Sequence, residues 1–188
     1  MDATFPIPAP RVGQNAWLTC SSSDVRIGEQ GVNHEGLRRA YERHWEPLVR
    51  LTTLIAGDVA NAEDIVQEVF IRSRDRLDGL PDDEVFAYLR RGTINAWKNT
   101  LRHASTERRA LPGLHERDVA DPADAVVERD RVWRAIETLR PRLRAVLVLR
   151  YYEELPDPEI ARLLGCTRST VRTRAMRALA AVRTELER

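Results

Sequence analysis

The segment LPDPEIARLLGCTRSTV, residues 155–171, constrains the fold of this chain more than any other. Asp157 can cap a helix that has Pro158 in its first position, where the missing N–H of proline does no harm. Gly165 then provides a turn, and Thr167 can cap a second helix. A short helix, a glycine-containing turn and a second helix form the arrangement of a DNA-reading helix-turn-helix.

The second of these helices has two contrasting sides on a helical wheel. Its apolar side, which we expect to pack inward, consists of Val171, Ala175, Ala178, Leu179, Val182 and Leu186. The other side carries cations, short hydroxyls and one apolar group, which suit a helix in the major groove: Arg168, Ser169, Arg172, Thr173, Met176 and Arg177. The alternative is an ordinary helical hairpin with a solvated basic face, but the caps, the turn and the apolar positions together favour DNA binding.

Helical spacing of apolar residues recurs along most of the remaining chain. It predicts one helix over 34–56, a second with Asn61 as its N-cap, a third from about residue 84 to 102, and further helix from about residue 132 to 152 with Pro141 starting a new helix inside it. No strand-like alternation of any length is present. The predicted fold is therefore all-α, with two small helical domains, an N-terminal helical bundle and the C-terminal helix-turn-helix, joined by a flexible linker.

This pattern divides the chain into four parts. Residues 1–33 contain three prolines and a serine run without apolar periodicity, and we expect a flexible tail. Residues 34–103 form the predicted bundle, residues 104–130 an acidic linker, and residues 131–188 the helix-turn-helix domain.

The formal net charge of +1 conceals an uneven distribution. Residues 84–111 carry a net charge of +4, residues 112–130 one of −4, and residues 131–188 one of +6. Two basic blocks separated by an acidic connector are a pattern that an account of the function has to explain.

Other classes of protein find little support. No stretch approaches the roughly 18–20 apolar residues that cross a bilayer, and the first residues lack the pattern of a secretory signal, so we expect a cytoplasmic protein without membrane insertion. The two cysteines and four histidines are scattered, which argues against a metal site or any other cofactor. No phosphate-binding loop or nucleophile elbow is present, so we expect no enzyme and no catalytic residues.

The second predicted helix shows an apolar group within a polar surface. Its apolar face consists of Ala62, Ile65, Val66, Val69 and Phe70. The opposite face consists of Asp64, Gln67, Glu68 and Ile71. Ile71 there has the layout of an anchor inside a polar rim, which is typical of a protein interface, although a single exposed isoleucine is also ordinary. From the residues alone the two interpretations are even.

The third predicted helix has an outer face without carboxylates. It consists of Tyr88, Arg91, Asn95, Lys98, Asn99 and Arg102, opposite an apolar face of Phe86, Leu89, Ile94, Trp97 and Leu101. Cations hold phosphates, amides bond to base edges, and an aromatic ring can stack on an unpaired base. A charged helix face is usually just solvated, but the lack of carboxylates favours nucleic acid.

Taken together, the two domains resemble the extracytoplasmic-function (ECF) sigma factors of the sigma-70 superfamily. The run AEDIVQEVFIR, residues 62–72, is similar to the family's helix that docks on the clamp helices of the largest polymerase subunit. The run AYLRR, residues 87–91, with Asn95 is similar to the helix that melts and reads the minus-ten element. The runs LRPR, residues 139–142, and VLVLRYY, residues 146–152, are similar to the lead-in to the family's helix-turn-helix.

The resemblance implies that core RNA polymerase and promoter DNA are the partners, with an anti-sigma factor as a possible third. Polymerase docking would involve Asp64, Gln67, Glu68 and Ile71 of region 2, and reading of the opened strand would involve Asn95 with Arg91 and Lys98. The loop 75–85 would capture a flipped base, and Arg172, Thr173 and Arg177 of region 4 would contact the minus-thirty-five element. The acidic linker would run toward the active-site channel. Trp97-Lys98 departs from the family pattern, and the tail has no counterpart in it.

The main alternative is a conventional helix-turn-helix repressor or activator with an N-terminal sensing bundle. Such a protein would bind a palindrome as a symmetric dimer. Co-purification with polymerase would separate the two hypotheses.

Overall fold

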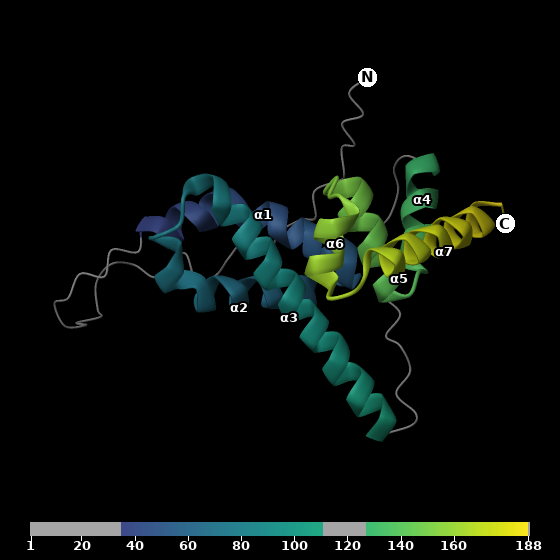
Figure 1. Ribbon diagram of the computed structural model, residues 1–188, viewed down its shortest axis with the longest axis horizontal. Coiled ribbons are helices and arrows are strands. Elements are labelled where there is room, and N and C mark those ends of the chain that lie inside the picture. The colour runs from purple at the N-terminus through teal and green to yellow at the C-terminus, as the bar shows by residue number, and fades with distance from the viewer. Residues whose placement is uncertain (1–34, 111–126, 188) are drawn as a thin grey trace.

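The computed structural model describes residues 35–110 and 127–187, and in this part of the chain every regular element is a helix and none is a strand (Figure 1). The N-terminal helices are α1 (Glu35–Ala56), α2 (Val59–Leu77) and α3 (Asp82–Ala110). The C-terminal elements are α4 (Val127–Glu137), α5 (Pro141–Leu147), the π-helical turn η1 (Val148–Tyr152), α6 (Asp157–Leu164) and α7 (Arg168–Leu186). The predicted all-α class is confirmed.

The helices α1, α2 and α3 pack into a bundle around an apolar core. Leu48, Val66 and Leu89, one from each helix, are fully buried in it. Beside them Tyr41 meets Phe70 edge-on, with ring centroids 5.5 Å apart. All five residues predicted to form the apolar face of α2 are buried, so the period-3.6 reading of that helix is correct.

The start of α2 differs from the sequence prediction. The N-cap is Asp58, whose carboxylate accepts a hydrogen bond from the Asn61 backbone N–H at 2.9 Å. Asn61 therefore lies inside the first turn and is not the cap. Asp58 has the extended backbone that a capping residue needs, and it offers an acceptor before the first helical residue.

The helices that flank the predicted linker are longer than expected. α3 continues past residue 102 to Ala110, and α4 begins at Val127. Helix therefore occupies both ends of the segment 104–130. Its middle, residues 111–126, and the predicted tail 1–33 lie outside the described residues.

The C-terminal half follows the predicted breaks. Pro141 begins α5, as expected, because a proline at the first position needs no helical N–H partner. η1 continues directly from α5, and its last residues lead into the loop before α6. Leu149 and Ile160 bring η1 and α6 together in the interior, where both are fully buried.

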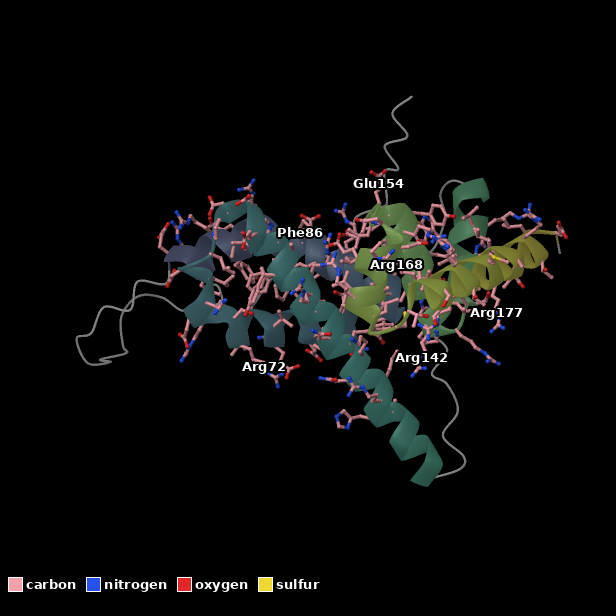
Figure 2. The ribbon with its side chains drawn as sticks, in the orientation of Figure 1. Arg72, Phe86, Arg142, Glu154, Arg168 and Arg177 are labelled. Carbon is pink, nitrogen blue, oxygen red and sulfur yellow. The ribbon has the colours of Figure 1, made fainter. Side chains whose placement is uncertain are left out.

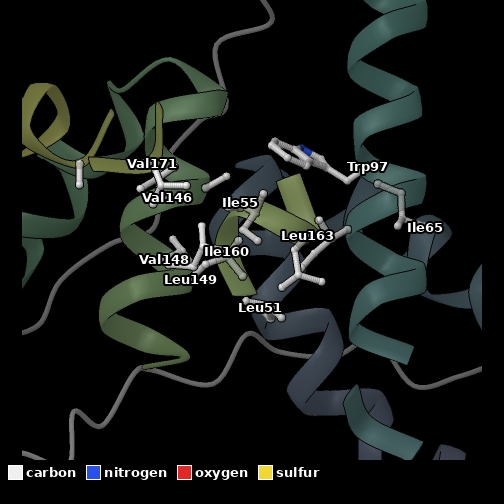
Figure 3. Packing of buried hydrophobic residues seen from close by; sticks show 14 residues of the cluster. Leu51, Ile55, Ile65, Trp97, Val146, Val148, Leu149, Ile160, Leu163 and Val171 are labelled. Carbon is white, nitrogen blue, oxygen red and sulfur yellow. The ribbon is translucent and has the colours of Figure 1, made fainter. Parts of the chain in front are cut away.

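A single apolar core joins the two halves of the protein (Figure 3). From the N-terminal half it takes Leu51, Ile55, Ile65, Ile94 and Trp97. From the C-terminal half it takes Ala145, Val146, Val148, Leu149, Ile160, Ala161, Leu163, Val171 and Ala175. The sequence predicts Ile94 and Trp97 to be buried, which is correct, but the cluster in which they are buried also contains residues of α5, η1, α6 and α7.

Arg144 fastens the same junction with hydrogen bonds. This α5 side chain, only 7% exposed, donates from Nε to the Ile55 carbonyl at 3.0 Å and from Nη2 to the Ala56 carbonyl at 2.8 Å. Its Nη1 donates to the Glu137 carbonyl at 3.1 Å. A cation at the C-terminus of α1 satisfies carbonyls that have no helical partner and complements the helix dipole.

Gly57 makes room for this arrangement. It has φ of +82°, in the left-handed region, and a methyl group placed on it would lie 2.8 Å from Nη2 of Arg144. Only glycine meets both requirements without strain.

We predict that Gly57→Ala lowers the free energy of unfolding by roughly 1–2 kcal/mol, because the new side chain is strained at positive φ and displaces Arg144. Urea unfolding followed by circular dichroism measures this. Gly79→Ala is the matched control, since its methyl group would meet only the Arg76 carbonyl at an ordinary 3.9 Å. Equal stabilities of the two variants would contradict the role assigned to Gly57.

Candidate polymerase and nucleic-acid interfaces

α6 and α7 form the helix-turn-helix that the sequence predicts. Gly165 ends α6 with φ of 65° and ψ of 45°, the left-handed conformation expected of a C-terminal glycine. Thr167 is the N-cap of α7, and its hydroxyl accepts a hydrogen bond from the Thr170 N–H at 3.2 Å. The Cys166 N–H donates back to the Ala161 carbonyl at 3.0 Å, which closes the turn. Cap and turn therefore fix the direction in which α7 leaves α6.

The start of α6 differs from the prediction. The capping position is Pro156, Asp157 is the first helical residue, and its side chain caps nothing. The carboxylate of Asp157 instead pairs with Arg150 and with Arg172, whose Nε lies at 3.3 Å. The hydrogen bond from Arg150 holds the pKa of Asp157 below its usual range. Because Asp157 pairs with these two arginines, its carboxylate accepts no hydrogen bond from the backbone N–H groups at the start of α6.

The outer face of α7 is open to solvent. All six side chains that the sequence assigns to it are exposed, namely Arg168, Ser169, Arg172, Thr173, Met176 and Arg177. Met176 is the most exposed large apolar side chain in the described chain, at 71%. Figure 2 shows Arg168 at the α6 end of this helix and Arg177 farther along it. Cations, hydroxyls and a thioether on one accessible helix have the chemistry of major-groove readout.

The opposite side of α7 is narrower than predicted. Val171, Ala175 and Ala178 are buried, and Val182 is half-buried, but Leu179 is 45% exposed, so its predicted inward orientation is wrong. Ala178 occupies the position against Leu139 and Leu147 at that level of the helix. Leu179, one residue on, is rotated away by about 100°.

α2 presents the acidic face. Asp64, Gln67, Glu68 and Ile71 are all exposed, and 61% of Ile71 is accessible. Glu68 pairs with Arg72 one turn later, and Figure 2 places Arg72 on the outer side of α2. An exposed pair of this kind contributes little to stability, so the face is available to a partner.

On α3 the predicted nucleic-acid face is only partly free. Tyr88, Arg91, Asn95, Asn99 and Arg102 are exposed. Lys98 is half-buried, and its ammonium donates to Asn95 Oδ1 at 3.1 Å and to the Leu163 carbonyl of α6 at 2.9 Å. Burial lowers the pKa of Lys98, and the neighbouring Arg102 lowers it further. The two candidate strand-reading residues Asn95 and Lys98 are thus held beside the helix-turn-helix.

A cleft of about 330 Å³ lies at this junction. Trp97, Leu164, Gly165 and Cys166 form part of its wall. Its charged lining consists of cations from both halves: Lys98, Arg102, Arg142 and Arg174. The described residues that line it include no carboxylate.

The sequence does not predict the burial of Arg90, a residue of the α3 motif. It is buried, and its guanidinium donates to Glu153 at 2.9 Å and to Glu159 at 2.7 Å, both in the C-terminal half. It also lies over the Phe86 ring, 5.7 Å from the centroid. The feature of the sequence that could have indicated this burial is that Arg90 directly follows Leu89, on the inner side of an amphipathic helix.

Among the described residues, no group of three or more His, Cys, Asp or Glu side chains could hold a metal ion. No helix within 35–110 or 127–187 is both long and apolar enough to cross a membrane.

The fold and these surfaces define the class of all-helical, helix-turn-helix DNA-binding proteins. Comparison with known proteins is more specific. Residues 40–107 match the family model for sigma-70 region 2, and residues 129–182 match the one for sigma-70 region 4.

Curated relatives agree with both matches. RNA polymerase sigma-E factor of Streptomyces avermitilis is 32% identical over 143 residues, which cover 76% of this chain and 80% of that protein. ECF RNA polymerase sigma factor SigL of Mycobacterium tuberculosis is 27% identical over 170 residues, covering 87% of this chain and 96% of that one. The chain belongs to the extracytoplasmic-function group of sigma-70 RNA polymerase sigma factors, as its resemblance implies.

A solved structure supports the fold. Sigma factor RpoE of Bartonella quintana, crystallised with the anti-sigma factor NepR, aligns with a TM-score of 0.62 at 19% identity, covering 81% of this chain and 95% of that one.

Proposed function

We propose that this sigma factor divides promoter recognition among three surfaces. The acidic face of α2 docks the protein on the clamp helices of core RNA polymerase. The outer face of α7 reads duplex DNA at the minus-thirty-five element. The carboxylate-free face of α3, with Tyr88, Arg91, Asn95, Lys98 and Arg102, holds the opened strand at the minus-ten element.

The observation that carries this proposal is the combination of an exposed apolar anchor, Ile71, in an acidic rim with two separate basic helix faces. A helix-turn-helix alone accounts only for duplex reading. A carboxylate-free second face offers phosphate and base contacts to a strand that has left the duplex. Their binding energy offsets the few kcal/mol needed to unstack a flipped base.

The protein acts by binding rather than by catalysis, and it does so in the cytoplasm, where polymerase and promoter DNA meet. Residues 34–103 and 131–188 serve as the two functional domains, with 104–130 connecting them. An anti-sigma partner stays a prediction from the resemblance.

Run-off transcription with core polymerase tests the function as a whole. We expect start sites at a defined set of promoters only when the protein is added, and weak DNA binding by the protein alone. Specific binding of a palindrome by a dimer, without any association with polymerase, would support the conventional repressor instead.

We predict that Ile71→Asp weakens binding to core polymerase by about tenfold or more, because a charge replaces the apolar centre of the interface. Biolayer interferometry with immobilised core enzyme measures the loss. Val59→Asp is the control, since Val59 is an exposed aliphatic residue of the same helix, 38% accessible, on a different side. Equal affinities for wild type and Ile71→Asp would refute the docking surface.

We predict that Arg177→Ala, in polymerase holoenzyme, reduces discrimination for the upstream element by about 1–3 kcal/mol, the usual value of a guanidinium contact to a base. Competition between matched and scrambled upstream elements gives this figure. Arg183→Ala, another exposed arginine of α7, controls for loss of charge. A uniform loss on all sequences would mean that Arg177 holds only phosphate.

A further inference from the structure

Three charged side chains connect η1 with the outer face of α7. Asp157, at the start of α6, accepts a hydrogen bond from Arg150 of η1 with one carboxylate oxygen. With its other oxygen it accepts one from Nε of Arg172, which lies at 3.3 Å. Neighbouring atoms cover most of the Asp157 and Arg150 side chains, whereas 72% of the Arg172 side chain is exposed. The carboxylate therefore links a largely covered arginine to an open one.

The position of this carboxylate is fixed from two sides. On the backbone, Asp157 lies between Pro156 and Pro158, whose rings restrict the chain at the start of α6. On the side chain, the hydrogen bond from Arg150 fixes the orientation of the carboxylate and holds the pKa of Asp157 below its usual range. Asp157 is therefore an ionised and well-oriented acceptor at the edge of the helix-turn-helix.

The hydrogen bond at Nε determines which donors Arg172 can offer to DNA. A guanidinium carries N–H donors on Nε and on two terminal nitrogens, in a rigid plane. Asp157 engages Nε, and within the described residues no hydrogen bond or ion pair engages Nη1 or Nη2 of Arg172. These two nitrogens form the end of the fork, which matches the paired acceptors O6 and N7 on the major-groove edge of guanine.

Arg172 differs in this respect from the other two arginines on the outer face of α7. Arg168 and Arg177 are exposed, and in the part of the chain that the structure describes neither pairs with a carboxylate. Such side chains lose conformational freedom when they bind DNA, and that loss weakens the contact. Arg172 is already held in one orientation before DNA arrives, so its contact loses less.

Two other roles for Asp157 agree less well with these contacts. A carboxylate can accept a hydrogen bond from N4 of cytosine, but both oxygens of Asp157 already accept from arginines. An ion pair that serves stability alone contributes little when one partner is as open as Arg172. A carboxylate beside a DNA-reading face also repels phosphates, so this position carries a cost that a gain in specificity offsets.

We propose that Asp157 is a positioning residue for promoter recognition: anchored by Arg150, it holds Arg172 so that the Nη1–Nη2 end of the guanidinium reads a guanine of the minus-thirty-five element. This role rests on the proposed reading of that element by the outer face of α7. Asp157 itself touches no base. Without it Arg172 keeps its charge and still binds phosphates, so affinity for DNA is retained while discrimination between sequences falls.

Competition binding with polymerase holoenzyme tests this role. Promoter duplexes in which each base pair of the upstream element is replaced in turn give the discrimination at every position, and unrelated DNA gives the non-specific affinity. Asp157→Asn keeps the shape of the side chain but offers an acceptor to only one of the two arginines. Discrimination at one G·C pair should fall about fivefold, the effect of ordering one long side chain on binding, without a loss of non-specific affinity. Glu154→Gln is the matched control, since this exposed carboxylate, which Figure 2 shows at the outer edge, pairs with no arginine among the described residues.

A cycle of single and double variants separates positioning from a merely structural role. Arg172→Ala should remove the discrimination at the same G·C pair, and Asp157→Asn added to it should cause no further loss, because no guanidinium is then left to position. Additive losses, an equal loss on all DNA, or unchanged discrimination in the folded Asp157→Asn variant would overturn the proposal. Circular dichroism verifies folding.

Should Asp157→Asn fail to fold, the wild-type chain still decides. In its NMR spectrum the Nε–H of Arg172, assigned by its loss in Arg172→Ala, should exchange with water more slowly than that of Arg168 or Arg177. Equal exchange rates would reject the positioning role.

The proposed function is tested separately by the wild-type holoenzyme. No preference for any upstream sequence would end the reading role of α7, and the role of Asp157 with it. A preference that Arg172→Ala reduces and Asp157→Asn does not would leave α7 as the reader and reject Asp157 alone.

Discussion

Two buried arginines, one in each half, donate hydrogen bonds to the other half and determine how the two halves are arranged. Arg90 leaves α3 to meet Glu153 and Glu159, and Arg144 leaves α5 to cap α1. Buried charges are costly to desolvate, and their pairing adds less stability than the apolar residues around them. A cation that lacks its acceptors is strongly unfavourable, however. We therefore infer that the apolar core holds the halves together, whereas the arginines fix which surfaces meet.

Periodicity in the sequence predicts the helices well because each amphipathic face depends on local spacing. Caps are harder to predict. Asp58, not Asn61, accepts the hydrogen bond at the start of α2, and two arginines pair with the Asp157 carboxylate that could have capped α6. The exposure of Leu179 was likewise not predicted from local spacing, because the width of the buried side of α7 depends on the helices that cover it. The pairing of Trp97 with residues of α6 is not a local property at all, and no spacing rule contains it.

The sequence predicts which residues share a helix face, but not which residues of other helices contact that face. Asp64, Gln67, Glu68 and Ile71 are exposed as the wheel of α2 implies, and so are the six residues of α7. Lys98 lies on the predicted side of α3, yet its hydrogen bond to Leu163 depends on a helix 65 positions later. Arg90 was visible as a cation on the buried side, but only its carboxylate partners reveal what it does.

A chain of 188 residues that forms two small domains has limited apolar surface for each, and small domains bury a lower fraction of their surface than large ones. Sharing one core compensates for this in the free protein. Separation would expose Ile55, Trp97 and Ile160, so the separated form is less favourable unless another contact offsets the loss. In the proposed function α2 binds polymerase and α3 binds the opened promoter strand, so these two partners together can supply that contact. On that proposal, the packing that stabilises the two halves also couples promoter reading to polymerase binding.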